Sequence, residues 1–91
     1  MNLANRTAVI TGASGGLGSV LTRDLASLGA NLALLERNPA KLASLVEDLA
    51  IPSERVLTHA VDLLDAGAAS GAAGAVVARF GRVDILLHVV G

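Results

Sequence analysis

A glycine-rich turn near the N-terminus limits the folds open to this chain. Residues 11–18 read Thr-Gly-Ala-Ser-Gly-Gly-Leu-Gly, and they follow the short apolar run Thr7–Thr11. From Leu17 onward, leucines recur at helical spacing, so the sequence predicts a buried strand that turns through glycines into a helix. Free backbone N–H groups and the positive end of the helix dipole meet at such a turn, which suits a pyrophosphate. Gly18, on the first helical turn, is expected to allow close packing of helix and strand.

The rest of the chain repeats this alternation of apolar runs and helical patterns. Strands are predicted over Thr7–Thr11, Asn31–Leu35, Arg55–Val61 and Asp84–Val90. The helices between them are predicted to begin near Gly16, at Pro39 after the N-cap Asn38, and after Asp65 as N-cap. Their ends are predicted at Gly29, Ile51-Pro52 and Gly81. The expected buried faces are Leu17, Leu21, Leu25 and Leu28 on the first helix, and Ala69, Ala73, Val76, Val77 and Phe80 on the third.

This order predicts an α/β fold of the type β-α-β-α-β-α-β. Continuous apolar strands joined by helices indicate a doubly wound parallel sheet that is covered on both faces. With right-handed crossovers and the strand order 3-2-1-4, the fourth strand would be an edge. Residues 85–90 read Ile-Leu-Leu-His-Val-Val, which is apolar on both faces, and proteins normally cover such an edge. We therefore expect a fold truncated after its fourth strand, with more chain to follow.

Composition excludes several classes of function. The 91 residues suffice for one small domain. The net charge is -1 and the sequence has no basic block, so it lacks the positive charge with which proteins bind nucleic acid. No apolar run approaches the roughly 20 residues of a membrane span, and the N-terminus lacks the apolar core of a signal peptide. A cytoplasmic protein without membrane contact is expected. There is no cysteine, and the isolated His59 and His88 do not form a metal site.

The glycine turn resembles a family motif. Thr-Gly-x-x-x-Gly-x-Gly is the motif of the short-chain dehydrogenases/reductases, and three further segments are similar to that family: Glu36-Arg37-Asn38, Val61-Asp62-Leu63 and Phe80–Leu86. The resemblance covers all 91 residues. It implies a Rossmann-like fold that binds NAD(P), and hydride transfer between nicotinamide and an alcohol or ketone. Residues 1–91 would be the cofactor-binding half-domain. The alternative is a glycine-rich turn that binds no ligand.

The resemblance also implies which residues bind the cofactor. They are Gly12, Ser14, Gly15, Gly16, Leu17, Gly18, Glu36, Arg37, Asp62, Leu63, His88 and Gly91. Ser14 could instead cap the turn, and Asp62, expected at the adenine amino group, could instead be a turn or capping aspartate.

Two adjacent charges bear on the choice between NAD and NADP. Glu36 takes the position where an acid favours NAD, and Arg37 takes the next position, where arginine often marks NADP. Our prediction leans to NAD, because a carboxylate repels a 2′-phosphate. The alternatives for this pair are solvated loop charges or a mutual ion pair.

The catalytic residues of the family have no counterpart in this chain. A proton donor must reach the substrate oxygen, and in the family a tyrosine serves with a lysine four residues later. The chain has no tyrosine, and Lys41, its one lysine, lies on the second helix. The fourth strand ends His88-Val89-Val90-Gly91 where the family has Asn-Asn-Ala-Gly. For His88 we favour a core or hydrogen-bonding role, or a contact with ribose, over catalysis. Thr11 is expected to brace the turn, and Asp84 to be structural.

Three hypotheses about function follow. The first is the cofactor half of an oxidoreductase, with a small-molecule substrate bound only by a longer parent chain. The second is a non-catalytic dinucleotide-binding module that pairs with a copy of itself through the open edge. The third is a pseudoenzyme fragment that assembles with another chain.

Overall fold

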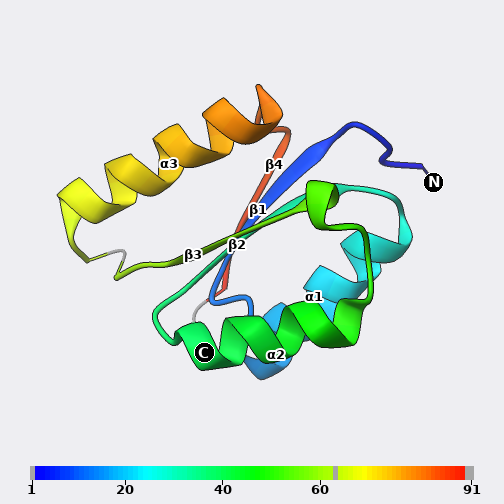
Figure 1. Cartoon of the computed structure of the whole chain (residues 1–91), viewed down its shortest axis with the longest axis horizontal. Coiled ribbons are helices and arrows are strands. Elements are labelled where there is room, and N and C mark those ends of the chain that lie inside the picture. The colour runs from blue at the N-terminus through cyan, green and yellow to red at the C-terminus, as the bar shows by residue number, and fades with distance from the viewer. Residues whose placement is uncertain (1, 63, 90–91) are drawn as a thin grey trace.

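Four parallel strands form the centre of the computed structural model, which describes residues 2–62 and 64–89 (Figure 1). They are β1 (Thr7–Thr11), β2 (Asn31–Glu36), β3 (Val56–Ala60) and β4 (Ile85–His88). Their order in the sheet is β3-β2-β1-β4, and each neighbouring pair is parallel. The predicted fold class and strand order are thus confirmed, with β3 and β4 shorter than expected.

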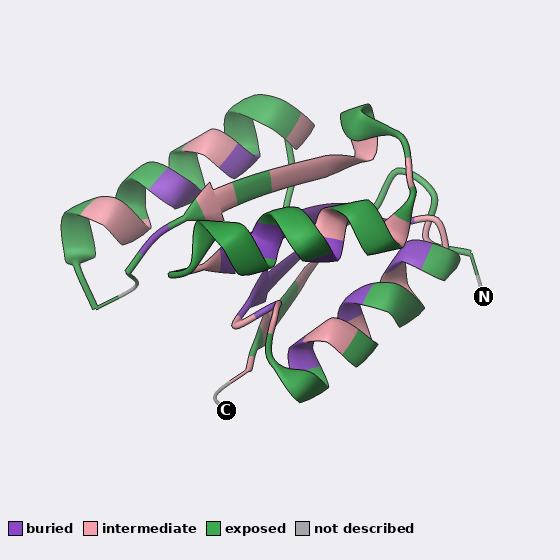
Figure 2. Cartoon of the chain, turned by 60° about the horizontal axis from the view of Figure 1, so that its bottom comes forward, coloured by how far each residue is buried: buried purple, intermediate pink, exposed green. Residues whose placement is uncertain are grey.

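The helices cover both faces of this sheet. Helices α1 (Gly16–Ser27) and α2 (Pro39–Leu49) lie on one face, and α3 (Ala66–Phe80) lies on the other (Figures 1 and 2). A short 3₁₀ helix, η1 (Ser53–Arg55), precedes β3, so the predicted third strand begins later than the sequence suggested. Alternating strands and helices with parallel pairing give one doubly wound, Rossmann-like unit.

The predicted N-caps of α2 and α3 and the predicted end of α3 are confirmed, whereas α1 ends at Ser27 and α2 at Leu49, slightly before the predicted Gly29 and Ile51. The Asn38 side chain accepts hydrogen bonds from the amides of Ala40 and Lys41 at the start of α2. Asp65 accepts one from the Ala68 amide at the start of α3. Gly81 ends α3 in the left-handed region, with φ of 76°, where glycine carries no steric penalty. Asn38 and Asp65 therefore satisfy amides that have no partner inside the helix.

The core consists of two apolar clusters, one on each side of the sheet. Alternate residues of each strand point to opposite faces, so Ile10 and Leu34 pack with α1 and α2, whereas Val9 and Leu35 pack with α3. The central strands β1 and β2 are buried along nearly their whole length. This burial on both faces explains why their sequences read as continuous apolar runs.

The buried face of α1 differs from the predicted leucine stripe. Gly18, Thr22 and Ala26 are buried, whereas Leu17 is 63% exposed. Small residues four positions apart let the helix backbone approach β1 closely, and the Thr22 hydroxyl donates to the Gly18 carbonyl (2.7 Å). The leucine periodicity therefore marks the flank of the contact and not its centre.

The predicted buried face of α3 is also partly wrong. Ala72 and Val76 are buried, Phe80 is half-buried, and Val77 is 55% exposed. The helix is rich in alanine and glycine, so its apolar residues do not define one stripe. It packs against Val9 of β1 as well as against β2 and β3, whereas Leu86 of β4, the register partner of Val9, is 66% exposed.

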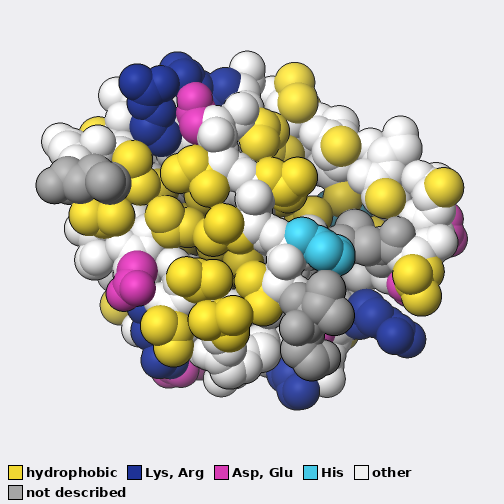
Figure 3. All heavy atoms as spheres, turned by 180° about the vertical axis from the view of Figure 1, so that it is seen from behind, with side chains coloured by type: hydrophobic (Ala, Val, Ile, Leu, Met, Phe, Trp, Pro, Cys, Tyr) yellow, Lys and Arg dark blue, Asp and Glu magenta, His cyan; other side chains and the backbone are white. Residues whose placement is uncertain are grey.

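The edge strand β4 is exposed as the sequence predicted. Among the described residues β4 pairs with β1 alone, and Leu86 is 66% exposed. Figure 3 shows hydrophobic side chains gathered over the middle of one face of the molecule. In the part of the chain that the structure describes, no helix is both long and apolar enough to cross a membrane.

Candidate functional site

The turn after β1 requires glycine at Gly12. Its φ of 68° lies in the left-handed region, and a Cβ there would overlap the carbonyl oxygen of Val89. The Gly12 amide donates to the Leu35 carbonyl (3.0 Å), and the Gly12 carbonyl accepts from the Gly15 amide (3.2 Å). The turn is thereby fixed against the carboxyl ends of both β2 and β4.

Gly16 and Gly18 have opposite surroundings. A Cβ at Gly18 would overlap the carbonyl oxygen of Gly12, so glycine at this position lets α1 pack closely against the turn that follows β1. A Cβ at Gly16 would meet no atom within 4 Å. Packing therefore does not require glycine at position 16, and the open space there leaves room for a ligand to approach the backbone.

The N-terminus of α1 presents unused donors. Its N-cap is Gly15, without a side-chain cap, and the first intrahelical bond runs from the Ser19 amide to the Gly15 carbonyl (2.8 Å). The amides of residues 16–18 therefore have no partner in the helix. Ser14 precedes this N-cap and lines the pocket, so its hydroxyl lies beside these amides. These donors and the helix dipole can hold an anion.

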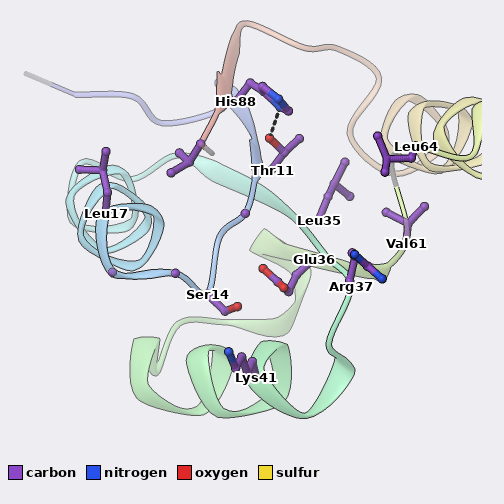
Figure 4. A pocket seen from close by; sticks show the side chains of 14 residues that line it. Thr11, Ser14, Leu17, Leu35, Glu36, Arg37, Lys41, Val61, Leu64 and His88 are labelled. Atoms are coloured by element: carbon purple, nitrogen blue, oxygen red, sulfur yellow. Dashed lines mark hydrogen bonds between the residues drawn. The ribbon is translucent and has the colours of Figure 1, made fainter. Parts of the chain in front are cut away.

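An open pocket of about 750 Å³ lies over this turn (Figure 4). It is lined by Thr11, Gly12, Ser14, Gly15, Gly16, Leu17, Leu35, Glu36, Arg37, Lys41, Val61, Leu64, His88 and Val89. It runs from the carboxyl end of β2 across β1 to the carboxyl end of β4. Between β1 and β4 the strand order reverses direction, which is where doubly wound sheets bind ligands.

Three charged side chains mark the β2 end of the pocket. Glu36 is half-buried, and its carboxylate points back toward Ser14, whereas the Arg37 side chain lies on the side of Val61 (Figure 4). Among the described residues no ion pair within 4.0 Å joins Glu36 to Arg37, so the predicted alternative of a mutual ion pair is not observed. Both charges remain able to meet a ligand.

Lys41 is a pocket residue that the sequence reasoning missed. It lies in the first turn of α2 and lines the pocket with Glu36 and Arg37. The available signal was its place in the chain, because α2 begins directly after the carboxyl end of β2, where the pocket lies.

Asp62 lies beside the pocket and is not part of its lining. Its carboxylate accepts a hydrogen bond from the Leu64 amide (3.0 Å), which is the turn geometry expected from its alternative role. Its neighbours Val61 and Leu64 do line the pocket. The predicted contacts at Leu63 and Gly91 lie outside the described residues.

His88 closes the β4 end of the pocket. Its Nδ1 lies 2.7 Å from the Thr11 hydroxyl oxygen, within a hydrogen bond that joins the ends of β4 and β1. The Thr11 hydroxyl was predicted to brace the glycine turn, but in the structure it forms its hydrogen bond with His88. His59 lies on β3 and does not line the pocket. No group of three potential metal ligands occurs within residues 2–62 and 64–89.

Asp84 belongs to the opposite end of the sheet. Its carboxylate accepts from Arg82 (2.6 and 2.8 Å) and from the Thr7 amide (2.8 Å), and Arg6 lies 3.5 Å away. The hydrogen bond from Arg82 and then that from Thr7 lower the pKa of Asp84 to about 2. This network joins β1 to the segment before β4, so the predicted structural role of Asp84 is confirmed.

Comparison with known proteins gives consistent matches. The sequence profile described as short chain dehydrogenase matches residues 6–91. A short chain dehydrogenase of Pseudocercospora fijiensis is 35% identical over 89 residues, which are 98% of this chain and 29% of that protein. The chain thus spans about a third of the length of such relatives.

Two solved structures are similar in fold and carry cofactors. A metagenomic short-chain oxidoreductase in complex with NADP has a TM-score of 0.84 and 37% identity, over 92% of this chain and 38% of that one. A 3-ketoacyl-(acyl-carrier-protein) reductase from Brucella melitensis, complexed with NADH, has a TM-score of 0.83 and 28% identity, over 93% of this chain and 34% of that one.

Proposed function

The chain belongs to the short-chain dehydrogenase/reductase family, and from that premise we propose that residues 1–91 form the NAD(P)-binding half-domain of an oxidoreductase. The observation that supports this most directly is the pocket over the Gly12–Gly18 turn, with free helix amides beneath open space at Gly16. When bound, the nicotinamide cofactor would supply or accept a hydride at an alcohol or ketone. The substrate would be a small molecule held by a longer chain, in the cytoplasm.

Each part of the dinucleotide has a proposed contact. The pyrophosphate lies beside Gly15 on the free amides of Gly16 and Leu17, with the Ser14 hydroxyl as a further donor. Gly12 and Gly18 shape the turn below it. The adenosine half then extends toward the end of β2, where Glu36 and Arg37 face its ribose. Asp62 and Leu63 contact the adenine. His88 and Gly91 border the other nucleoside.

We propose NAD as the preferred cofactor. A half-buried carboxylate that points into the pocket can accept hydrogen bonds from the adenosine ribose hydroxyls, and it repels a 2′-phosphate. Arg37 and Lys41 oppose this preference, because either cation would attract that phosphate. The effect of the Glu36 carboxylate should prevail, because Glu36 is less exposed than the two cations and its charge is therefore less screened by solvent.

The test is a calorimetric titration of the protein, as its source expresses it, with NADH and NADPH. We expect NADH to bind more tightly. Glu36→Gln keeps the shape of the side chain and removes its charge, so it should shift the ratio of the two dissociation constants toward NADPH by about tenfold. The matched variant Arg37→Gln should shift the ratio in the opposite direction. Failure of both cofactors to bind would refute the proposed function.

A non-catalytic dinucleotide-binding module is the second candidate. The observation that favours it is the absence of tyrosine from the sequence. The intact mass of the native product distinguishes the two candidates. A mass that corresponds to these 91 residues alone would favour the binding module, acting as a homo-oligomer. A mass roughly three times larger would favour the oxidoreductase, since the relatives are about that long.

A further inference from the structure

The Thr11–His88 pair occupies a distinctive place in the sheet. The two residues are register partners at the carboxyl ends of β1 and β4, where the strand order reverses. Thr11 is buried, with 6% of its surface exposed, whereas His88 is exposed and lines the pocket. The pair therefore joins a fixed hydroxyl to an imidazole that a ligand can reach.

This hydrogen bond is compatible with either tautomer of the imidazole. When Nδ1 carries no proton, the Thr11 hydroxyl donates to it across 2.7 Å. When Nδ1 is protonated it donates to the same oxygen, and the hydroxyl proton can turn to the Leu87 carbonyl, 3.5 Å away. In both cases the ring is held by Nδ1, and Nε2 has no hydrogen-bond partner among the described residues.

The other charged groups of the pocket leave this nitrogen available. Glu36, Arg37 and Lys41 are the charged residues that line it, and none makes a hydrogen bond or ion pair with His88. In Figure 4 they lie toward β2 and α2, whereas His88 and Thr11 lie at the β4 end. The two ends of the pocket thus differ in character, with three charged side chains at one end and the Thr11–His88 hydrogen bond at the other.

We propose that His88 Nε2 hydrogen-bonds a hydroxyl of the second ribose, the one that carries nicotinamide, and that Thr11 positions the ring. The inference rests on the proposed dinucleotide binding. With adenosine at Glu36 and the pyrophosphate on α1, the remaining nucleoside extends across β1 toward β4. A ribose hydroxyl both donates and accepts, so it suits Nε2 in either form.

ADP and ADP-ribose form a matched pair of probes, because they differ by this second ribose. Calorimetric titration of the wild-type protein should show tighter binding of ADP-ribose. His88→Ala should weaken ADP-ribose binding by about three- to tenfold, the effect of one hydrogen bond, and leave the ADP constant within about twofold. His88→Asn is the second variant. Its amide can still reach Thr11, yet it ends short of the Nε2 position, so it should lose the same affinity while keeping the melting temperature.

Thr11 is tested by a double-mutant cycle. Thr11→Val is isosteric and removes the hydroxyl, so it should weaken ADP-ribose binding in the wild-type background and have no further effect on His88→Ala. Thr11→Ser restores the hydroxyl and should recover most of the affinity. A merely structural role for Thr11 would instead lower ADP and ADP-ribose binding equally in both backgrounds.

The outcomes separate this inference from the proposed function. Equal losses for ADP and ADP-ribose in His88→Ala, or no loss for either, would overturn the ribose contact while leaving dinucleotide binding intact. A wild-type protein that binds neither probe would overturn both.

Discussion

Gly16 and Gly18 lie two positions apart in one turn, yet they are glycine for different reasons. A Cβ at Gly18 would overlap the Gly12 carbonyl oxygen, whereas one at Gly16 would enter open space. Gly18→Ala should therefore lower the free energy of unfolding by about 1–3 kcal/mol, as overpacking does. Gly16→Ala should leave it unchanged or raise it by up to about 1 kcal/mol, because alanine is the better helix former. Urea unfolding of both variants measures the contrast.

The same pair separates folding from binding. The methyl group of Gly16→Ala would occupy the space that the phosphates need, so we expect ADP affinity to fall by about tenfold or more in a fully folded protein. Titration with ADP measures this. Wild-type affinity in Gly16→Ala would show that the phosphates do not lie on this turn.

For single residues, the sequence predicted the glycines of the turn well, but it predicted the side chains around the turn less well. Gly12 and Gly18 could be assigned because chain geometry alone demands glycine there. Lys41 and the Thr11–His88 bond could not, since both depend on which strand and helix ends meet in space. The sequence predicted a core or hydrogen-bonding role for His88, but it did not predict that Thr11 on the neighbouring strand would be its partner.

Arg55 connects η1 to the end of α1 and to the start of β2, which are distant from it in the sequence. From the end of η1, its Nη2 donates to the carbonyls of Ala26 (3.1 Å) and Ala30 (2.8 Å), at the C-terminal end of α1 and before β2. Carbonyls at the end of a helix lack intrahelical donors, and a guanidinium can satisfy more than one. Arg55 therefore stabilises the α1–β2 connection.

Replacement of this arginine should weaken the whole unit. Arg55→Met keeps an unbranched apolar stem and removes the donors, so we expect the free energy of unfolding to fall by about 1–3 kcal/mol. Arg79→Met is the matched control. Arg79 is exposed and donates to one backbone carbonyl, that of Ser53 (2.9 Å), so its loss should cost less than about 0.5 kcal/mol. Equal effects in urea unfolding would contradict the role given to Arg55.

The helix faces show why sequence periodicity has limits at this level. In α1 the leucine stripe predicted one face, yet Gly18, Thr22 and Ala26 carry the contact with the sheet. A hydropathy pattern weights large apolar residues, whereas a helix that must approach a strand closely selects small ones. The caps at Asn38 and Asp65 were predictable, because they depend on hydrogen bonds within a few residues.

Across the whole molecule, Asp84 joins the first strand to the last. Its folded pKa of about 2 lies below the ordinary 3.8, so its interactions stabilise the fold above about pH 4. This contribution is lost as the pH falls from about 4 to about 2. Asp84→Asn should therefore lower the melting temperature at pH 7 and reduce its dependence on pH within that window. Calorimetric scans between pH 2 and 7 measure both effects, and parallel acid profiles for the two proteins would contradict this role.

The strand order was predictable because right-handed crossovers and parallel pairing leave few arrangements for four strands. That order places β4 at an open edge, and Leu86 on it is 66% exposed. Unpaired backbone groups beside apolar side chains favour pairing with a second edge, and two copies can pair antiparallel about a two-fold axis. We therefore expect the 91-residue chain to self-associate.

Sedimentation velocity tests this expectation. Leu86→Lys places a charge on the edge without altering a buried side chain, and it should shift the distribution toward monomer with little change in melting temperature. Leu64→Lys is the control for added charge, since Leu64 is 92% exposed but lies before α3, off the sheet edge. The same shift in both variants would attribute association to general apolar exposure. A shift confined to Leu86→Lys would identify the β4 edge as the contact, because the two variants add the same charge at different places.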